Sequence, residues 1–378
     1  MMQTPVIYKT PPTTVIRPHM LFEAAIERIS AAYSKENAKQ DGIYYWPDPL
    51  PTPTYERPDP LILFSPEDED HNHAEMEQVQ VKEYQAIIPM TRGEVLERRS
   101  RENIKPSMQI PLGLIDKPEE QVRDTFLVDL HGAAGALTGG PLLVAGAQHS
   151  GKATVLQTML LWLTTRFLPG QLRCAVIDPF GELDQFHGLP HFYNANGDLL
   201  WTDGGTEEQL THFINNITTE LQRRREAFPN QHWNTHTLSQ LWSQGITHPQ
   251  FLLIISNYQS FAERISASMA LKKLAMTIIE SRTAGNYLVI TTSETGSRYI
   301  PPEIMSKCST KIGLALNDQQ RNELFGRTPF IPEAISGRGL IITPERKVHQ
   351  VQLALPTTGK SESLRDEHLK NELARTIH

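Results

Sequence analysis

Short apolar runs alternate with amphipathic segments from about residue 109 onward. Between several of the runs, apolar residues recur at helical spacing, which predicts helices at 152–168, 206–227, 261–282 and 318–325. The runs are three to five residues long, are rich in leucine, isoleucine and valine, and lie at 142–145, 174–177, 251–255, 287–290, 312–316 and 340–342. Buried strands that alternate with helices are typical of a mostly parallel sheet. We therefore predict an α/β fold with a mostly parallel sheet and helices on both of its faces.

The first third of the chain has a different pattern. Residues 1–70 contain eleven prolines, and because proline fixes φ and lacks an amide donor, this density excludes long helices and central strands. One amphipathic helix is predicted at 18–37, and rough alternation predicts a strand at 77–88, beyond an acidic loop. The predicted division of the chain is a Pro-rich linker and small N-terminal extension at 1–107, an α/β module at 108–356, and a weakly ordered or helical tail at 357–378.

Composition and charge narrow the range of functions. The 378 residues are 39% hydrophobic, which is enough apolar material for a sizeable core. The formal net charge is −7, and a mildly acidic chain is a poor candidate for gripping a polyphosphate backbone. Two cysteines cannot form a disulfide framework, and no apolar run approaches the roughly 18 residues that a membrane helix needs. We expect a cytoplasmic chain without direct nucleic-acid binding.

One motif outweighs all others in the sequence. After the run at 142–145 the chain reads Gly-Ala-Gln-His-Ser-Gly-Lys, which matches the phosphate-binding pattern G-x-x-x-x-G-K between a strand and a helix. Glycines let backbone amides converge on phosphate oxygens, the helix N-terminus adds positive potential, and the lysine neutralises phosphate charge. ATP is the expected cofactor, and the residues predicted to bind it are Gly146, Gln148, His149, Ser150, Gly151, Lys152, Ala153 and Thr154.

Two positions that usually serve the metal and the attacking water are replaced. Ala153 stands where the motif continues with a hydroxyl that binds magnesium. The Phe-Leu-Leu-Ile-Ile strand is followed by Ser256 and Asn257 where an acid is expected. No catalytic residue and no metal ligand are therefore assigned, and the role of magnesium is left open. Asp178, at the end of an earlier run, is the first substitute acid to test, although Asp-Pro pairs also start ordinary turns.

Two smaller features of the sequence each allow two interpretations. Thr292 and Ser293 end an apolar run and either contact the γ-phosphate as a sensor or cap a helix. His149 stands where such loops commonly have glycine, and it either crowds the loop or offers one more donor. The surviving groups predict binding of ATP with little or no hydrolysis, and the alternatives are loss of binding and a competent ATPase.

Weaker signals favour ordinary surface roles. Three histidine pairs have spacings that suit zinc but lack an evident third ligand: His71/His73, His187/His191 and His232/His236. The run Arg223–Arg225 ends a predicted helix, where the helix dipole favours cations without any contact to nucleic acid.

An ordered set of segments accompanies the phosphate loop. It consists of Ile110–Asp116, Gly188–His191, Glu220–Phe228, Phe325–Arg327, Gly337–Leu340 and Val351–Pro356. With these segments, the stretch from about 109 to 356 resembles the FtsK/SpoIIIE ATPases, specifically a later module of the EccC/EssC proteins of type VII secretion. Upstream, Trp46–Pro51 looks like the linker that joins consecutive modules in these proteins. The resemblance implies a RecA/FtsK-like P-loop fold.

The resemblance also implies a function. In that family several ATPase modules follow a membrane anchor, and later modules often have degenerate motifs, as at Ala153, Ser256 and Asn257. It implies a module that binds ATP as a structural element and serves assembly or the docking of secreted WXG100-type substrates. The implied partners are that substrate and neighbouring ATPase modules, at the inner face of the cell membrane through the parent complex. An active DNA-translocating ATPase and an interaction scaffold that has lost nucleotide binding are the alternatives.

Overall fold

A computed structural model describes most of the chain from residue 108 onward, together with a short N-proximal strand. The described residues are 62–64, 108–118, 122–131, 140–167, 169–226, 249–343, 346–357 and 362–377. The helix predicted at 18–37, the acidic loop and the strand predicted at 77–88 lie outside them. Among the described residues, no helix is long and apolar enough to cross a membrane.

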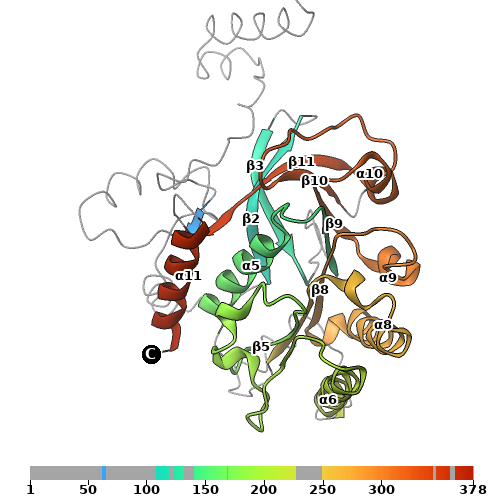
Figure 1. The fold of residues 1–378 in the computed structure, drawn as a ribbon. Coiled ribbons are helices and arrows are strands. Elements are labelled where there is room, and N and C mark those ends of the chain that lie inside the picture. The colour runs from blue at the N-terminus through green and yellow to red at the C-terminus, as the bar shows by residue number, and fades with distance from the viewer. Residues whose placement is uncertain are drawn as a thin grey trace, which may run out of the picture. The chain divides into compact units, whose positions relative to one another are not determined.

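A ten-stranded sheet forms the centre of the fold (Figure 1). Its strands are β2 (Gln109–Lys117), β3 (Val122–Asp129), β4 (Leu142–Gly146), β5 (Leu172–Ile177), β6 (Trp201–Thr202), β7 (Gln250–Ile255), β8 (Asn286–Thr292), β9 (Thr310–Leu314), β10 (Arg338–Ile342) and β11 (Val348–Leu353). The order is β3-β2-β11-β10-β9-β4-β8-β7-β5-β6. Neighbours from β9 to β6 are parallel, whereas β9, β10, β11 and β2 pair antiparallel. A separate parallel pair joins β1 (Ile62–Phe64) to β12 (Leu355–Thr357).

Helices cover both faces of this sheet, so the predicted α/β class is confirmed. On one face lie α5 (Lys152–Arg166) and α11 (Glu362–Ile377) (Figure 1). On the other face lie α6 (Glu207–Glu226), α8 (Ile265–Glu280), α9 (Pro302–Lys307) and α10 (Asp318–Phe325). Short 3-10 helices occur at Asp184–Phe186, Pro190–Phe192, Tyr258–Phe261 and Arg282–Ala284.

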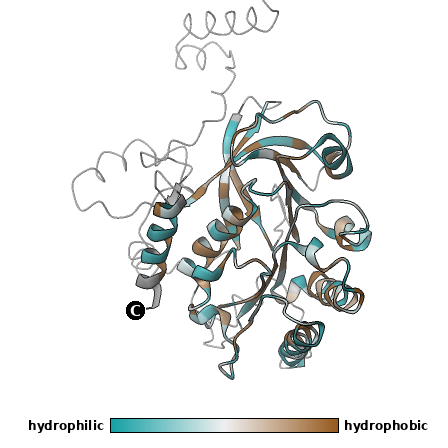
Figure 2. Cartoon of the chain, viewed as in Figure 1, coloured by the Kyte–Doolittle hydropathy of each residue, from teal (hydrophilic) through white to brown (hydrophobic). Residues whose placement is uncertain are grey.

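The central strands are buried on both faces because successive side chains of a strand point to opposite sides. In β4, Leu142 and Val144 join the core that contains α5 and α11. Leu143 and Ala145 join a second core with α6, α8, α9 and α10. In Figure 2 the strands are largely brown, whereas the helices carry teal on their outer sides. This two-sided burial explains why the strands appear in the sequence as unbroken apolar runs.

Several element boundaries differ from the sequence prediction, and two of these differences have a clear local cause. Strand β9 ends two residues earlier than predicted, since Ala315 has a φ of 47°, which breaks the extended conformation. The helix predicted from residue 261 begins at Ile265, because Tyr258–Phe261 forms a 3-10 helix whose Phe261 side chain is buried. Apolar spacing therefore identified the buried side chains but not the change of backbone between them.

The C-terminal stretch, predicted to be a weakly ordered or helical tail, contains helix α11. Leu369 and Leu373 of this helix are buried in the core that also holds α5. Their four-residue spacing places both side chains on one face of the helix. Thr357 Oγ1 also donates a hydrogen bond to the Arg365 carbonyl oxygen at 3.0 Å. The tail therefore adds apolar contacts to the module.

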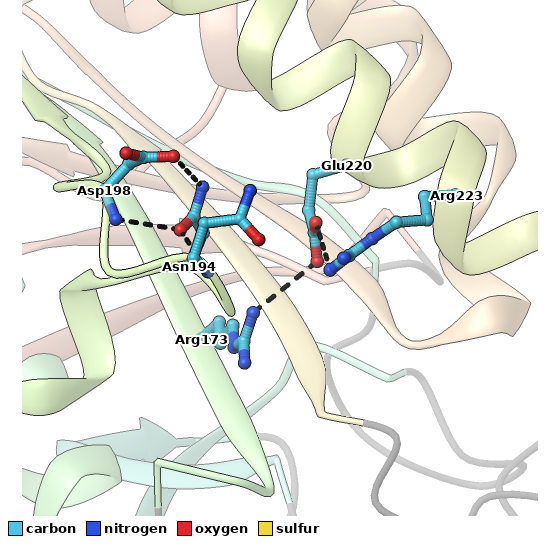
Figure 3. A network of polar contacts seen from close by, with 6 residues as sticks. Arg173, Asn194, Asp198, Glu220 and Arg223 are labelled. Atoms are coloured by element: carbon cyan, nitrogen blue, oxygen red, sulfur yellow. Dashed lines mark hydrogen bonds and ion pairs between the residues drawn. The ribbon is translucent and has the colours of Figure 1, made fainter.

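Ion pairs near the C-terminal end of helix α6 connect this helix to β5 (Figure 3). Glu220 Oε1 lies 3.6 Å from Arg173 Nη1, and Glu220 Oε2 lies 2.7 Å from Arg223 Nη2. Arg224 is buried, and burial lowers the pKa of its guanidinium to about 10. Because Arg223 is ion-paired and Arg224 is buried, the arginine run does not present three free cations to solvent.

The packing of α11 gives a stability prediction. Leu369→Ala should lower the free energy of unfolding by about 2–5 kcal/mol, because it removes buried apolar contacts and leaves a cavity. The matched control is Leu364→Ala on the same helix, where the leucine is 37% exposed and the expected loss is below about 1 kcal/mol. Urea denaturation measures both variants. Equal losses would contradict the proposed contribution of α11 to the core.

Candidate functional site

The carboxyl ends of β4, β8, β7 and β5 lie side by side at one edge of the sheet, because these strands are consecutive parallel neighbours. The phosphate-loop segment follows β4, and Thr292 is the last residue of β8. Ser256 follows β7, and Asp178 follows β5. In open α/β sheets, ligands bind outside the carboxyl ends of the strands. The fold therefore gathers at one edge the positions that the sequence separates widely.

The loop between β4 and α5 contains three positions that favour glycine, which is compatible with a phosphate cradle. A Cβ on Gly146 would lie 2.5 Å from the Leu314 carbonyl oxygen, so only glycine fits there. Gly151, directly before α5, has a φ of 102°. His149 has a φ of 59°, in the left-handed region that favours glycine. Its side chain is exposed, so it does not crowd the interior of the loop.

Lys152 and Ser150 provide the polar atoms of the loop. Lys152 Nζ donates to the carbonyl oxygens of Gly146 at 2.9 Å and of Ala147 at 2.8 Å. Burial lowers the pKa of this ammonium group, and the negative charge of Glu182 partly opposes that shift. Ser150 Oγ is buried and has no hydrogen-bond partner within the described part of the chain. An unpaired buried hydroxyl in a loop with a lysine and a helix N-terminus fits a phosphate oxygen.

The same loop has fewer groups suited to bind magnesium than groups suited to bind phosphate. Ala153 lies in the first turn of α5 and has no side-chain oxygen, and Thr154 beside it is half-buried. At the end of β7, Ser256 and Asn257 are buried and neutral. The loop residues fit the phosphates of a nucleotide. Neither they nor Ser256 and Asn257 supply an anionic ligand for its metal ion. A carboxylate for that ion has to come from another element.

A carboxylate does reach the end of β7, from the loop that follows β5. Glu182 Oε2 accepts hydrogen bonds from Ser256 Oγ at 2.8 Å and from Asn257 Nδ2 at 2.9 Å. The Glu182 carbonyl oxygen accepts from Gln157 Nε2 of α5 at 3.2 Å. The neutral residues after β7 therefore hold an acid instead of supplying one. Glu182 is not among the residues predicted from the sequence.

Asp178, the substitute acid named from the sequence, organises this loop. Its Oδ2 accepts a hydrogen bond from the Leu183 amide at 2.8 Å. Burial raises the pKa of the Asp178 carboxyl, and hydrogen bonds from the amides of Leu183, Glu182 and Phe180 oppose that shift. Asp178 thus closes the turn that carries Glu182. The available signal was the segment Asp-Pro-Phe-Gly-Glu, in which a turn starter is followed by a second acid four residues later.

Thr292 and Ser293 lie next to the phosphate-loop strand, since β8 pairs with β4 and Thr292 is in register with Ala145. Thr292 Oγ1 donates to the Glu294 carbonyl oxygen at 2.6 Å and accepts from the Glu294 amide at 3.1 Å. The Ser293 amide donates to Gln259 Oε1 at 3.1 Å. Both residues close a turn and do not cap a helix. Their sensor role stays a prediction.

The histidine pair that the structure describes does not form a metal site. His191 Nε2 donates to the Phe167 carbonyl oxygen at 2.7 Å, and His187 packs edge-on against Trp201. The other two pairs lie outside the described residues. In the parts of the chain that the structure covers, no group of three or more His, Cys, Asp or Glu side chains could hold a metal ion by itself.

Comparison with known families decides the assignment. The FtsK/SpoIIIE family model matches residues 94–356, which is more than half of the chain. The chain belongs to the FtsK/SpoIIIE family. The matched region of this FtsK/SpoIIIE protein includes the phosphate loop, the loop after β5 and the ends of β7 and β8.

This FtsK/SpoIIIE protein is similar in sequence to parts of secretion proteins. It is 25% identical over 268 residues to the ESX secretion system protein EccC of Geobacillus thermodenitrificans (strain NG80-2), covering 70% of this chain and 17% of that protein. It is 26% identical over 265 residues to the type VII secretion system protein EssC of Staphylococcus aureus (strain NCTC 8325 / PS 47), covering 68% and 17%. The chain therefore spans less than a fifth of the length of these relatives.

Solved structures share the fold of this FtsK/SpoIIIE protein. EssC (ATPases 2 and 3) from Geobacillus thermodenitrificans aligns with a TM-score of 0.61 at 24% identity, covering 71% of this chain and 49% of that chain. Thermomonospora curvata EccC (ATPases 2 and 3) in complex with a signal sequence peptide aligns with a TM-score of 0.58 at 21% identity, covering 72% and 47%. These likenesses confirm the predicted P-loop ATPase fold.

The backbone of His149 gives a second prediction. A protein with glycine at a given position is usually less stable than one with alanine there, but at a left-handed position the order reverses. His149→Gly should therefore be more stable than His149→Ala by about 1 kcal/mol. The same pair of changes at Gln148, which has no positive φ, should follow the usual order. Chemical denaturation of the four variants measures the difference. The same order at both positions would show that His149 is not held in a strained conformation.

Proposed function

We propose that this chain is a nucleotide-binding module of a type VII secretion motor. It binds ATP, hydrolyses it little or not at all, and serves motor assembly or the docking of secreted WXG100-type substrates. The observation that carries the nucleotide half is the loop before α5, where Lys152, the unpaired Ser150 hydroxyl and the helix N-terminus converge. Membership of the FtsK/SpoIIIE family and similarity to EccC and EssC support the motor half.

Slow hydrolysis is expected from the two replaced positions. When bound, magnesium neutralises charge that develops on the transferred phosphoryl group. Ala153 offers no hydroxyl to support that ion, and Ser256 and Asn257 offer no base to the attacking water. A missing general base lowers the rate by about 10²–10⁴ where no other group takes over its role. Lys152 and Ser150, the groups proposed to bind phosphate, are separate from these positions.

The nucleotide half predicts that Lys152→Ala removes stabilisation by ATP. A ligand that binds only the folded state stabilises it by about 2.7 kcal/mol at a hundredfold excess over its Kd. Millimolar ATP should therefore raise the Tm of the wild-type chain but not that of the variant. Differential scanning fluorimetry with and without magnesium measures the shift, after the Tm of each protein without ligand is recorded.

The matched control is Lys272→Ala, since this lysine lies on the outer surface of α8 in an exposed ion pair with Glu303. It should respond to ATP like the wild type. Rapid magnesium-dependent turnover that requires Lys152 would contradict the proposed slow hydrolysis. Hydrolysis stimulated by DNA, with salt-dependent DNA binding, would favour the DNA-translocating alternative. A wild-type chain that shows no shift with ATP would favour the interaction scaffold.

The partners and the location are proposed by analogy with the relatives. The solved EssC and EccC structures contain ATPases 2 and 3 of their proteins, so consecutive ATPase domains occur in one chain there. We therefore expect neighbouring ATPase modules of the same motor as partners of this chain. The parent complex would place it in the cytoplasm, at the inner face of the cell membrane.

The docking half has a candidate surface at the start of α8. Ile265 and Met269 lie one helical turn apart and are 75% and 69% exposed. Ser266, the residue after Ile265, belongs to a shallow, open depression that is also lined by Glu207, Glu208, Thr211, His212 and Asn215. Exposed apolar side chains with a polar rim are typical of protein-binding surfaces. The proposed occupant is the C-terminal signal of a WXG100-type substrate, since the EccC structure holds a signal sequence peptide.

This surface predicts that the double change Ile265→Ser and Met269→Ser weakens binding of such a signal peptide by at least about tenfold, because apolar contacts at an interface centre carry most of its binding energy. Ile331→Ser is the matched control, since Ile331 is 71% exposed elsewhere. Fluorescence anisotropy with a labelled peptide measures binding. Wild-type affinity in the double variant would exclude this surface. ATP-induced stabilisation should be unchanged in both proteins.

A further inference from the structure

We infer that Glu182 is the metal-supporting carboxylate of the nucleotide site, supplied by the loop after β5 in place of an acid at the end of β7. The inference rests on the nucleotide half of the proposed function and adds a dependence on magnesium to it. It concerns the binding of the metal–nucleotide complex and not the rate of hydrolysis.

The position of Glu182 is set by several elements. Ser256 and Asn257 donate to the same carboxylate oxygen, and Gln157 of α5 donates to the backbone carbonyl of Glu182. Asn257 itself has a φ of 50°, which is uncommon for a residue other than glycine. The backbone amide of Asn257 donates a hydrogen bond to Thr291 Oγ1 at 2.9 Å, so β8 helps to hold this conformation. Strained backbone of this kind persists where the surroundings determine it, and it gathers at functional sites.

The charge of Glu182 is not neutralised by its hydrogen-bond donors. Ser256 and Asn257 are neutral, so their hydrogen bonds stabilise the carboxylate without cancelling its charge. The ammonium group that interacts with it electrostatically belongs to Lys152, whose Nζ donates to two loop carbonyls. A carboxylate in this state remains able to attract a second cation.

With a triphosphate bound, the second cation attracted by Glu182 would have a defined place between the carboxylate and the phosphates. Phosphate oxygens and a carboxylate carry like charges, and a divalent cation between them removes the repulsion. Magnesium is usually bound through one or two carboxylates together with substrate phosphates. Since Ala153, Ser256 and Asn257 supply no anionic oxygen, Glu182 is the carboxylate at this edge that has contacts to the end of β7. Magnesium should therefore strengthen ATP binding through Glu182.

The alternative is that Glu182 only anchors its loop, and Glu182→Gln separates the two roles. Glutamine has the same shape and keeps a carbonyl oxygen that can accept the hydrogen bonds of Ser256 and Asn257. An anchoring role therefore survives the change, whereas the negative charge is lost. Glu280→Gln is the matched control, because this exposed carboxylate lies at the C-terminal end of α8.

The experiment measures ATP affinity by isothermal titration calorimetry, with magnesium and with EDTA, on the 378-residue chain. For the wild type and Glu280→Gln, magnesium should strengthen binding by at least about tenfold. For Glu182→Gln the gain should fall below about threefold, and metal-free ATP should bind at least as tightly as to the wild type, because the repulsion is gone. Glu182→Asp keeps the charge on a shorter side chain. It should also lose part of the gain, without tighter binding of metal-free ATP.

The outcomes separate this inference from the proposed function. An undiminished magnesium gain in both Glu182 variants, with ATP binding that still requires Lys152, would overturn the inference and leave the proposed function in place. A wild-type chain that binds no ATP in either condition would overturn the nucleotide half and the inference with it. If Glu182→Gln has a much lower Tm than the wild type, Glu182→Asp alone decides the result.

Discussion

The burial of parallel strands on both faces is the constraint on which the rest of this structure depends. In β4, neighbouring side chains are divided between two cores, one under α5 and α11 and the other under α6 and α8. A shift of its register by one residue would move every side chain into the opposite core, where the surrounding side chains are packed around different volumes. The residue that follows each strand is therefore held at a fixed position along the sheet edge. A loop as short as the one from Gly146 to Gly151 acquires its geometry from this constraint.

The same constraint accounts for the arrangement of Ser256, Asn257 and Glu182. Parallel neighbours lie about 4.8 Å apart, so a side chain from the loop after β5 reaches the end of β7 without any distortion of the sheet. Two carboxylates at one such position would repel each other, and one of them would take up a proton. A hydroxyl and an amide at the end of β7 avoid that repulsion and donate hydrogen bonds to the incoming acid. The neutral strand end and the displaced acid are thus physically compatible features.

Much of the fold could be predicted from apolar runs, but the candidate site could be predicted only in part. The phosphate loop is contiguous, so its residues could be named directly as candidates. Glu182 was missed because its contacts with Ser256 and Asn257 depend on strand order, which no local pattern states. Leu369 and Leu373 are surrounded by charged residues, so the sequence predicts a weakly ordered or helical tail there without predicting the burial of these two side chains. Both omissions concern contacts between segments that are far apart in the sequence.

The position of Lys152 suggests how a nucleotide acts on the module. Each of its hydrogen bonds to a loop carbonyl contributes about 1.5–3 kcal/mol at most, and bonds to phosphate are stronger because both partners are charged. A triphosphate can therefore redirect the ammonium group. The lysine begins α5, and Thr158 and Trp162 of this helix donate to the carbonyl oxygens of Ala354 and Gln109. Under the proposed function, the energy of nucleotide binding would therefore act on a helix packed in the core, as expected for a ligand that orders the module.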